Sequence, residues 1–441
     1  MTTIAPSHTA PDLATPDRHA ALKFITCGSV DDGKSTLIGR LLVDSRSVLQ
    51  DQLDNVSKSG AADLALFTDG LSAEREQGIT IDVAYRYFAT PARKFIIGDT
   101  PGHEQYTRNM VTAASSADAA VVLVDATKLQ WKGVDEVTLL PQTRRHALLL
   151  KLLRVPSIVF AVNKLDALED SALPAQATEA FTRIREALEN FAAQAGIQVA
   201  ATIPISALQG HNVVSASPGW CGYVGASLLS LLEQLPVTPA ELARPLAFPV
   251  QWVEKFSSSS DTHQGRRVFW GRLATGQAQV GQTVTAFPSG KTATIAQVLN
   301  HVRQPESVSA NHSAGIVLDR ELDVSRGDWL LADTADLAAR QKVSGTVAWM
   351  DDAPLVVGRS YWALHGHRWI KAKVLRINHR LDIHTLAQTD AVALEPNAIG
   401  HVTLALQQPI AALGFGESRV LGSLILVDTA THTTAGALLI E

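Results

Sequence analysis

The sequence predicts a mostly parallel, doubly wound α/β domain with a phosphate-binding P-loop, followed by two β-barrel domains. Three observations lead to this fold class. A glycine-rich segment with a lysine and a serine, residues 28–35, stands between a strand-like run and a helix-like run. Near-continuous apolar runs then alternate with helical patterns up to about Leu235. Beyond that point, short strand-like runs such as 248–253 and 267–273 are broken by turn residues, as in small β-barrels.

The glycine-rich segment has the residues and the context of a P-loop. The strand-like run 22–27 precedes it and the helix-like run 36–42 follows it. Its glycines let backbone N–H groups turn toward a polyphosphate, and the helix adds the positive end of its dipole. Lys34 is expected to reach the β- and γ-phosphates, and Ser35 to hold Mg²⁺. The predicted nucleotide-binding residues of this segment are Gly28, Ser29, Val30, Asp31, Asp32, Gly33, Lys34, Ser35 and Thr36.

Polar residues follow several of the later strands expected in this domain. These strands are expected at residues 85–89, 94–98, 119–124, 157–162 and 200–205. Asp99 ends the second of them and is placed to support Mg²⁺ through its water shell. Gly102 lacks a side chain and can turn its N–H toward a γ-phosphate. The strands therefore predict a nucleotide site at the carboxyl edge of the sheet.

Two further segments indicate guanine rather than adenine. Asn163, Lys164 and Asp166 follow the apolar strand 157–162. An aspartate there can accept hydrogen bonds from the N1 and 2-amino groups of guanine, a donor pair that adenine lacks. Ser206 and Ala207, after the last strand, are expected to close over the base.

Changes in composition divide the chain into a tail and three domains. Residues 1–20 are rich in Thr, Ala, Pro and His and are interpreted as a disordered tail. The helical pattern stops at prolines 236 and 239, and again at proline 245. The expected domains are a nucleotide-binding domain at 21–240, a β-barrel at 244–336 and a second β-barrel at 341–441.

Composition also limits the class of partner. The 441 residues carry a formal net charge of −5, which favours small ligands or a protein over nucleic acid. No apolar run is long enough to span a membrane. Two cysteines, Cys27 and Cys221, cannot form a disulfide framework. A cytoplasmic location is therefore expected.

Taken together, these motifs resemble the translation-factor class of GTPases. The run 74–81, Glu-Arg-Glu-Gln-Gly-Ile-Thr-Ile, completes the resemblance. It implies GTP and Mg²⁺ as ligands, with Ser35, Thr80 and Asp99 at the metal. Thr80 would close on Mg²⁺ in the GTP state, and His103 would position the attacking water. Lys34, Thr80 and His103 are thus the catalytic candidates, and Asp31 resembles a P-loop aspartate that helps neutralise charge between the β- and γ-phosphates.

Within that class, the chain is most similar to the GTPase subunits of bacterial sulfate adenylyltransferase. Elongation factors usually carry histidines in place of Ser29 and Asp32. The other stretches that carry this resemblance are residues 36–42, 69–71, 73–78, 82–88, 103–110, 248–251, 325–328 and 379–382. It implies a heterodimer or higher assembly with a small catalytic subunit that makes adenylyl sulfate and pyrophosphate from ATP and sulfate. This chain would hydrolyse GTP and couple that reaction to the uphill adenylyl transfer. An elongation-factor-like carrier of aminoacyl-tRNA and a GTP-dependent scaffold are the alternatives.

Some segments depart from the family's pattern. Residues 128–141, which include Trp131, are longer than the usual connection and are expected on the surface, as a partner contact or a tolerated insertion. Residues 257–260 form an unusual polar run. Some members carry a fused adenylylsulfate kinase domain, and its activity is expected to be absent because a single P-loop is visible.

A basic and aromatic cluster lies near residues 365–380. His365 and His367 have metal-ligand spacing, and lysines beside Trp369 suit RNA. The alternation of apolar and basic residues at 370–375 favours instead a strand with one solvated face, with a subunit or substrate contact as the second interpretation.

Overall fold

The computed structural model describes residues 20–45, 80, 82–168, 175–255, 267–300, 305–332, 337 and 339–441. The predicted tail, most of the segment that leads to Thr80 and the polar run 257–260 lie outside this part of the chain. Contacts divide the molecule into two compact units, 1–238 and 239–441. The limits expected for three domains stay a prediction.

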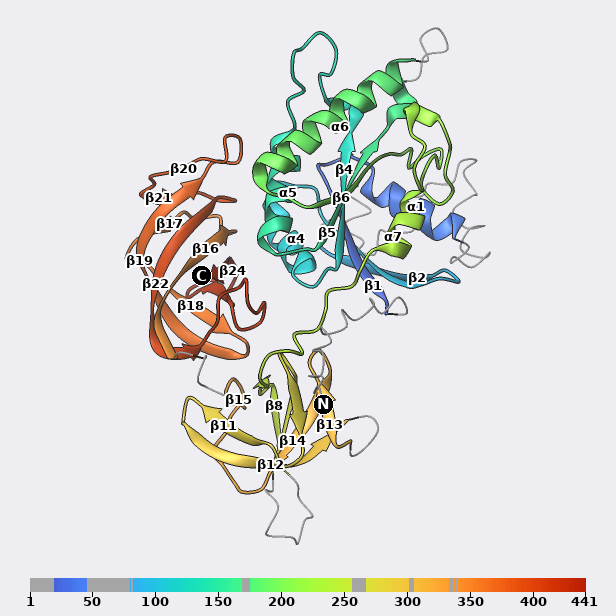
Figure 1. The fold of residues 1–441 in the computed structure, drawn as a ribbon. Coiled ribbons are helices and arrows are strands. Elements are labelled where there is room, and N and C mark those ends of the chain that lie inside the picture. Colours follow the sequence, from blue (N-terminus) through green and yellow to red (C-terminus); the bar gives the residue numbers. More distant parts are fainter. Residues whose placement is uncertain are drawn as a thin grey trace, which may run out of the picture. The chain divides into compact units, whose positions relative to one another are not determined.

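The first unit is built on a six-stranded sheet of order β2-β3-β1-β4-β5-β6 (Figure 1). Its strands are β1 (Leu22–Cys27), β2 (Ala84–Ala89), β3 (Lys94–Asp99), β4 (Ala119–Asp125), β5 (Ser157–Asn163) and β6 (Val199–Pro204). The edge strand β2 pairs with β3 in antiparallel fashion, and the other pairs are parallel. The predicted mostly parallel sheet is confirmed.

Helices cover the two faces of this sheet (Figure 1). The α-helices are α1 (Lys34–Asp44), α4 (Thr107–Ala114), α5 (Pro141–Leu152), α6 (Ala175–Ala195) and α7 (Leu228–Gln234). Short 3₁₀ turns are η3 (Glu104–Tyr106), η4 (Ala126–Lys128), η5 (Leu165–Leu168) and η6 (Trp220–Gly222). No helix in the described ranges is long and apolar enough to cross a membrane.

The central strands are buried on both faces, which explains their continuous apolar sequence. Every residue of β4 and β5 is buried. Alternate residues such as Phe24, Phe95 and Val121 share one core with the buried faces of α1 and α7. Cys27, the last residue of β1, is not part of this core. Its buried thiol lies 3.8 Å from the carbonyl oxygen of Val121. Both cysteines of the chain are buried free thiols.

The second unit begins with a seven-stranded antiparallel sheet of order β7-β15-β11-β12-β14-β9-β8. Its strands are β7 (Ala247–Pro249), β8 (Trp252–Lys255), β9 (Arg267–Arg272), β11 (Thr283–Phe287), β12 (Lys291–Leu299), β14 (Ser313–Leu318) and β15 (Trp329–Leu331). A two-stranded ribbon of β10 (Gln277–Gln279) and β13 (Ser307–Ser309) accompanies it. Phe248, Phe269 and Ile316 belong to the core of this sheet.

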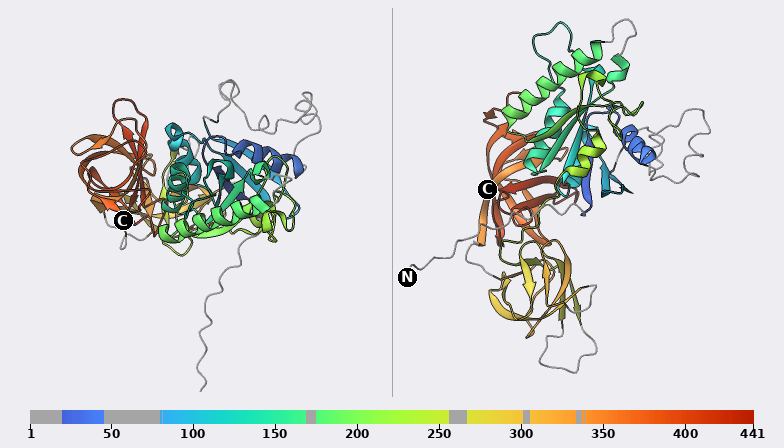
Figure 2. Two further views of the ribbon diagram at one scale, coloured as in Figure 1. Left: turned by 90° about the horizontal axis from the view of Figure 1, so that it is seen from above. Right: turned by 45° about the vertical axis from the view of Figure 1, so that its right-hand side comes forward.

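A closed barrel follows in the same unit. Its strands come in the order β18-β23-β24-β16-β22-β19, and β18 pairs with β19 to close the ring (Figure 2). They are β16 (Ala339–Trp349), β18 (Ser360–His365), β19 (Arg368–Leu381), β22 (Ile399–Ala411), β23 (Ser423–Asp428) and β24 (Thr434–Ile440). Short strands β17 (Leu355–Val356), β20 (Gln388–Thr389) and β21 (Ala393–Leu394) complete it. Trp349 and Tyr361 lie in its core, 5.4 Å apart between ring centroids.

One strand assignment was wrong. The continuous strand expected near residues 248–253 is two strands, because β7 pairs with β15 whereas β8 pairs with β9. Pro249 ends β7, and proline has no N–H to continue the ladder. Val250 and Gln251 form the crossing between the two partners, through N–H bonds to Asp328 and Trp270.

The basic cluster at residues 365–380 is a strand of the barrel wall, as its alternation predicts. Ile370, Ala372 and Val374 are buried, and the lysines between them are exposed. His365 is fully buried, its Nε2 lies 3.1 Å from the carbonyl oxygen of Leu421, and its ring packs against Trp329. This packing accounts for His365 without a metal.

The segment 128–141 is anchored rather than a loosely attached surface loop. Trp131 is 6% exposed, and Leu129, Val137 and Leu139 are buried beside it. Arg183, from α6, donates hydrogen bonds to the carbonyl oxygens of Trp131 at 2.6 Å and Asp135 at 3.1 Å, and also to that of Val134. The indole of Trp131 is therefore part of the domain's own packing, and a partner contact through the exposed residues of this segment stays a prediction.

Replacing Trp131 by alanine is expected to destabilise the first unit by about 3 kcal/mol, because a large buried side chain leaves a cavity. Differential scanning calorimetry would record this as a lower midpoint of that unit's transition. Tyr87→Ala, which truncates a side chain that is 71% exposed on β2, is the matched control. Equal midpoints for the two variants would contradict the anchoring role.

Candidate functional site

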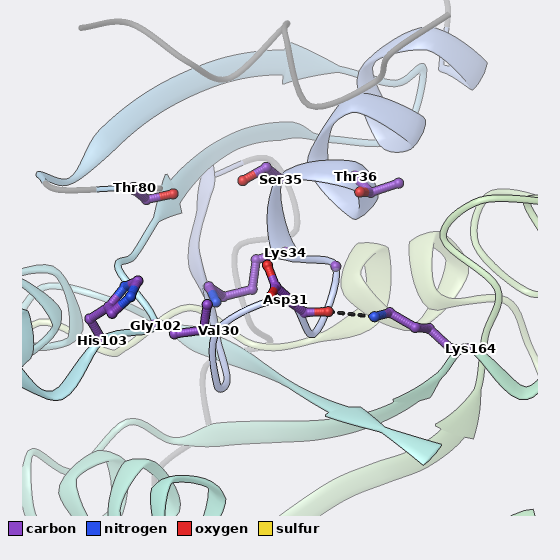
Figure 3. A pocket seen from close by; sticks show the side chains of 10 residues that line it. Val30, Asp31, Lys34, Ser35, Thr36, Thr80, Gly102, His103 and Lys164 are labelled. Atoms are coloured by element: carbon purple, nitrogen blue, oxygen red, sulfur yellow. Dashed lines mark hydrogen bonds between the residues drawn. The ribbon is translucent and has the colours of Figure 1, made fainter. Parts of the chain in front are cut away.

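The loop between β1 and α1 surrounds a cleft of about 350 Å³ (Figure 3). Gly33 stands at the N-cap of α1 with φ +92°, in the left-handed region that favours glycine. A Cβ on Gly33 would lie 2.5 Å from Nδ2 of Asn163. In the described part of the chain, no side chain caps the start of α1, so its first N–H groups face the cleft region uncapped. The helix start therefore has the properties of an anion site.

Lys34 points its ammonium back under the loop. It is 7% exposed, and Nζ donates hydrogen bonds to the carbonyl oxygens of Ser29 at 2.7 Å and Gly28 at 3.3 Å. Burial lowers the pKa of Lys34, and the carboxylates of Asp99 and Asp32 oppose that shift. The lysine thus holds the loop closed by its carbonyls and stands next to the cleft that it lines.

Asp99 and Ser35 meet at the carboxyl end of β3. Asp99 is 2% exposed, and its carboxylate accepts hydrogen bonds from Ser35 Oγ and Thr26 Oγ1, both at 3.1 Å. A hydroxyl beside a buried carboxylate is an all-oxygen pair, which suits Mg²⁺. Thr80 lines the same cleft. Of the three predicted metal residues, Ser35 and Asp99 are therefore hydrogen-bonded to each other, and Thr80 lines the cleft that Ser35 also lines.

Gly102 and His103 approach the P-loop from the segment after β3. A Cβ on Gly102 would lie 2.6 Å from Lys34 Nζ and 2.9 Å from the backbone of Ser29, so only glycine fits there. His103 lines the cleft beside it, with Thr80 nearby (Figure 3). The cleft thus collects the predicted phosphate and catalytic residues Val30, Asp31, Gly33, Lys34, Ser35, Thr36, Thr80, Gly102, His103 and Lys164.

Two of the predicted guanine residues, Asn163 and Ser206, are buried and do not line the cleft. Asn163 is 2% exposed, and its Nδ2 donates to the carbonyl oxygen of Asp32 at 2.8 Å while its Oδ1 accepts from Ala207 N–H at 3.0 Å. Asn163 therefore ties the P-loop to the segment after β6. Ser206 is buried, and its Oγ accepts from the N–H of Gln209.

Lys164 and Asp166 differ in how they are engaged. Lys164 lines the cleft, and Nζ donates to the carbonyl oxygen of Asp31 at 2.6 Å and lies 2.8 Å from the Asp125 carboxylate (Figure 3). Asp166 is partly exposed and, among the described residues, its carboxylate has no hydrogen bond or ion pair. Its acceptor oxygens are therefore available to a ligand with paired donors.

Sequence reasoning missed the contribution of β4 to this site. Lys128, in η4, places Nζ 2.9 Å from Asp32 Oδ1 and also donates to the carbonyl oxygen of Val30. Asp32 has no exposed surface, and its other oxygen accepts from the N–H of Ser29 at 2.6 Å. The signal was present, since Asp125 ends an apolar strand and a lysine follows it three residues later.

A polar cluster on α5 was also missed. Arg145 donates to Glu104 Oε1 at 2.7 Å and to Gln142 Oε1 at 2.8 Å, and so connects α5 with the residue after His103. His146 is 1% exposed, and its Nε2 lies 2.9 Å from Gln142 Nε2. Burial, with the charges of Lys34 and Arg145, lowers the pKa of His146 to about 3. The imidazole is therefore neutral at physiological pH.

Comparisons with known proteins agree with this geometry. Residues 19–239 match the family model of the elongation factor Tu GTP binding domain, and residues 342–441 match that of the GTP-eEF1A C-terminal domain-like family. The first unit is thus a GTP-binding domain of the elongation factor Tu class.

Two curated relatives extend over most of the chain. It is 40% identical over 445 residues to sulfate adenylyltransferase subunit 1 of Laribacter hongkongensis, covering 97% of this chain and 88% of that protein. It is 44% identical over 424 residues to the bifunctional enzyme CysN/CysC of Xylella fastidiosa, covering 94% of this chain. The chain matches only 65% of the length of that bifunctional enzyme. The chain belongs to the sulfate adenylyltransferase subunit 1 family.

Among solved structures, sup35 complexed with GDP aligns over 98% of this chain and 97% of that chain, with a TM-score of 0.42 and 19% identity.

His146→Gln is expected to make the protein less sensitive to acid. The pKa of a histidine in the unfolded chain is near 6.5, well above the pKa of the buried His146. Between these two pKa values the unfolded chain binds a proton at this position and the folded chain does not. The free energy of unfolding therefore falls as the pH drops below about 6.5, and this group accounts for a loss of about 2 kcal/mol at pH 5.

Urea unfolding at pH 7.5 and pH 5 measures that loss. The His146→Gln variant should lose less stability between the two pH values than the unmodified protein. His384→Gln, the same exchange at an exposed histidine, is the matched control. An unaltered pH dependence in His146→Gln would show that the buried imidazole is not responsible.

Proposed function

We propose that this chain is the GTP-hydrolysing subunit of a heteromeric sulfate adenylyltransferase. The observation that carries the proposal is the single cleft where Lys34, Thr80, Gly102 and His103 converge, in a chain of the subunit 1 family. In this proposal GTP hydrolysis is coupled to the formation of adenylyl sulfate and pyrophosphate from ATP and sulfate. The adenylyl transfer takes place on a separate small catalytic subunit.

The P-loop binds the phosphates through its backbone and one lysine. Lys34 exchanges its bonds with the carbonyl oxygens of Ser29 and Gly28 for the β- and γ-phosphate oxygens. The uncapped N–H groups at the start of α1 and the N–H of Gly102 supply further donors. A side chain on Gly102 would collide with the Lys34 ammonium and the Ser29 backbone, and so would displace the lysine that serves the phosphates.

The oxygen donors of Ser35, Asp99 and Thr80 fit a magnesium ion. Ser35 and Thr80 would hold it directly, and Asp99 through its water shell. When held by these residues, the metal would supply positive charge that offsets the negative charge developing on the phosphates during transfer. The buried Asp99 accepts the hydrogen bond of the Ser35 hydroxyl at the edge of the cleft.

His103 is the proposed organiser of the attacking water. It lines the cleft next to Gly102 (Figure 3). A residue that holds water in line with the transferred phosphoryl group contributes by positioning, which dominates phosphoryl transfer. Glu104, the next residue, accepts a hydrogen bond from Arg145 on α5, which links the segment that carries His103 to that helix.

Coupling needs an element with two states. The segments that carry Thr80 and Gly102 would order around the γ-phosphate and Mg²⁺ and relax after hydrolysis. Because adenylyl sulfate formation is strongly unfavourable, a favourable reaction linked to the same conformational cycle shifts the overall yield. The small catalytic subunit would respond to this switch.

Asp166→Asn tests guanine recognition. The aspartate can accept from both N1–H and the 2-amino group of guanine, whereas asparagine suits xanthine, which has a carbonyl at the 2-position. GTP affinity should fall by about tenfold or more, and affinity for xanthosine triphosphate should rise. Calorimetric titration measures both, and Asp135→Asn, at an exposed aspartate of the same unit, is the control. An equal loss of affinity for GTP and for xanthosine triphosphate would show that Asp166 does not recognise guanine.

The coupled reaction tests the whole proposal. The purified chain is mixed with the small catalytic subunit, ATP, sulfate and pyrophosphatase, and adenylyl sulfate is measured with and without GTP. GTP should raise the yield, and His103→Ala should bind GTP but abolish the increase. A yield that is indifferent to GTP would refute coupling. Association of the chain with aminoacyl-tRNA instead of the small subunit would favour a carrier function.

A further inference from the structure

Lys128 and Asp32 form an ion pair on the outer side of the P-loop. Asp32 is completely buried although it belongs to a loop that must bind an anion. Lys128 Nζ lies 2.9 Å from one Asp32 oxygen, and the N–H of Ser29 lies 2.6 Å from the other. Both oxygens of this carboxylate are therefore held by the protein itself.

A buried carboxylate beside a polyphosphate site requires compensation. Two like charges in a partly desolvated region repel strongly, and removing the partner of a buried charge is costly. Lys34 also faces Asp32, but binding of phosphate would draw the Lys34 charge toward the ligand. Lys128 is the cation that stays with Asp32 while Lys34 serves the nucleotide.

Lys128 also orients the loop backbone. It donates to the carbonyl oxygen of Val30, and Lys164 donates to that of Asp31. In a planar trans peptide the C=O and the following N–H point in opposite directions. Drawing the Val30 carbonyl outward therefore turns the Asp31 N–H inward, and Asp31, with φ +59°, lines the cleft in that conformation.

Asp125 holds the two lysines in place. This aspartate is 1% exposed at the end of β4, and its carboxylate lies 2.8 Å from Lys164 Nζ and 3.9 Å from Lys128 Nζ. Its other oxygen accepts from the N–H and hydroxyl of Thr127, which fixes the start of η4. Asp125, at the end of β4, thus positions the two lysines, Lys128 and Lys164, that donate hydrogen bonds to the P-loop.

We propose that Lys128 is a positioning residue for the phosphate loop, which neutralises the buried Asp32 and turns the Asp31 amide toward the nucleotide. The inference rests on the proposed function, because the ligand of the loop is taken to be GTP. The ion pair of Asp32 and Lys128 thus contributes to the affinity for the phosphates and does not affect the choice between guanine and adenine. The effect of Lys128 is exerted through Asp32 and Val30, without contact with the ligand.

A set of four variants tests this role in the full-length chain. Lys128→Met should weaken GTP and GDP by about tenfold or more, with the ratio of GTP to ATP affinity unchanged. Asp32→Asn combined with Lys128→Met should restore affinity to within about threefold of the unmodified chain, because no uncompensated carboxylate remains. Lys128→Arg should retain most of the affinity. Lys132→Met, an exposed lysine of the same segment bonded to Gln176, should behave as the unmodified chain.

The double variant separates positioning from direct phosphate contact. If Lys128 bound phosphate itself, removing the Asp32 charge would not restore affinity, and the double variant would stay as weak as Lys128→Met. That result, or unchanged affinity in Lys128→Met, would overturn the inference. If Lys128→Met fails to fold, the comparison of Asp32→Asn/Lys128→Met with the unmodified chain decides, since the inference requires near-normal GTP affinity there. Failure of the unmodified chain to bind GTP would instead refute the proposed function.

Discussion

Lys34 lies buried beneath the P-loop with its ammonium on two loop carbonyl oxygens, and much of the first unit is arranged around that contact. A buried ammonium without a carboxylate in direct contact is expensive, so the loop has to supply its carbonyls and neighbouring strands their carboxylates. Asp99 at the end of β3 and Asp32 in the loop act on Lys34 by charge. Gly102 leaves room for the same ammonium from the opposite side.

The sheet brings these groups together because four parallel strands end at one edge. β1 leads to the P-loop, β3 to Asp99 and Gly102, β4 to Asp125 and Lys128, and β5 to Asn163. Asn163 donates to the loop backbone and accepts from the N–H of Ala207, so one buried amide joins the P-loop to the segment after β6. The strand ends therefore form a single cooperative support for the loop.

The strands of the first unit were predictable because burial on both faces produces continuous apolar runs. The strand expected at 119–124, for example, is Ala119–Asp125. The glycines and Lys34 were predictable because phosphate binding restricts backbone and charge alike, and the cleft brings Thr80 and His103 beside them. The ion pair of Asp32 with Lys128 was not, since it joins residues 96 positions apart that no local pattern connects. The anchoring of Trp131 was not predictable for a similar reason, since its backbone carbonyl accepts from Arg183, 52 positions further along the chain.

The most direct measurement of the central claim is an equilibrium titration of the purified chain with GTP and with ATP, in the presence of Mg²⁺. The account predicts strong binding of GTP and binding of ATP weaker by about a hundredfold or more, since the acceptor oxygens of Asp166 match guanine donors that adenine lacks. Equal affinity for the two nucleotides, or no binding of GTP, would contradict it.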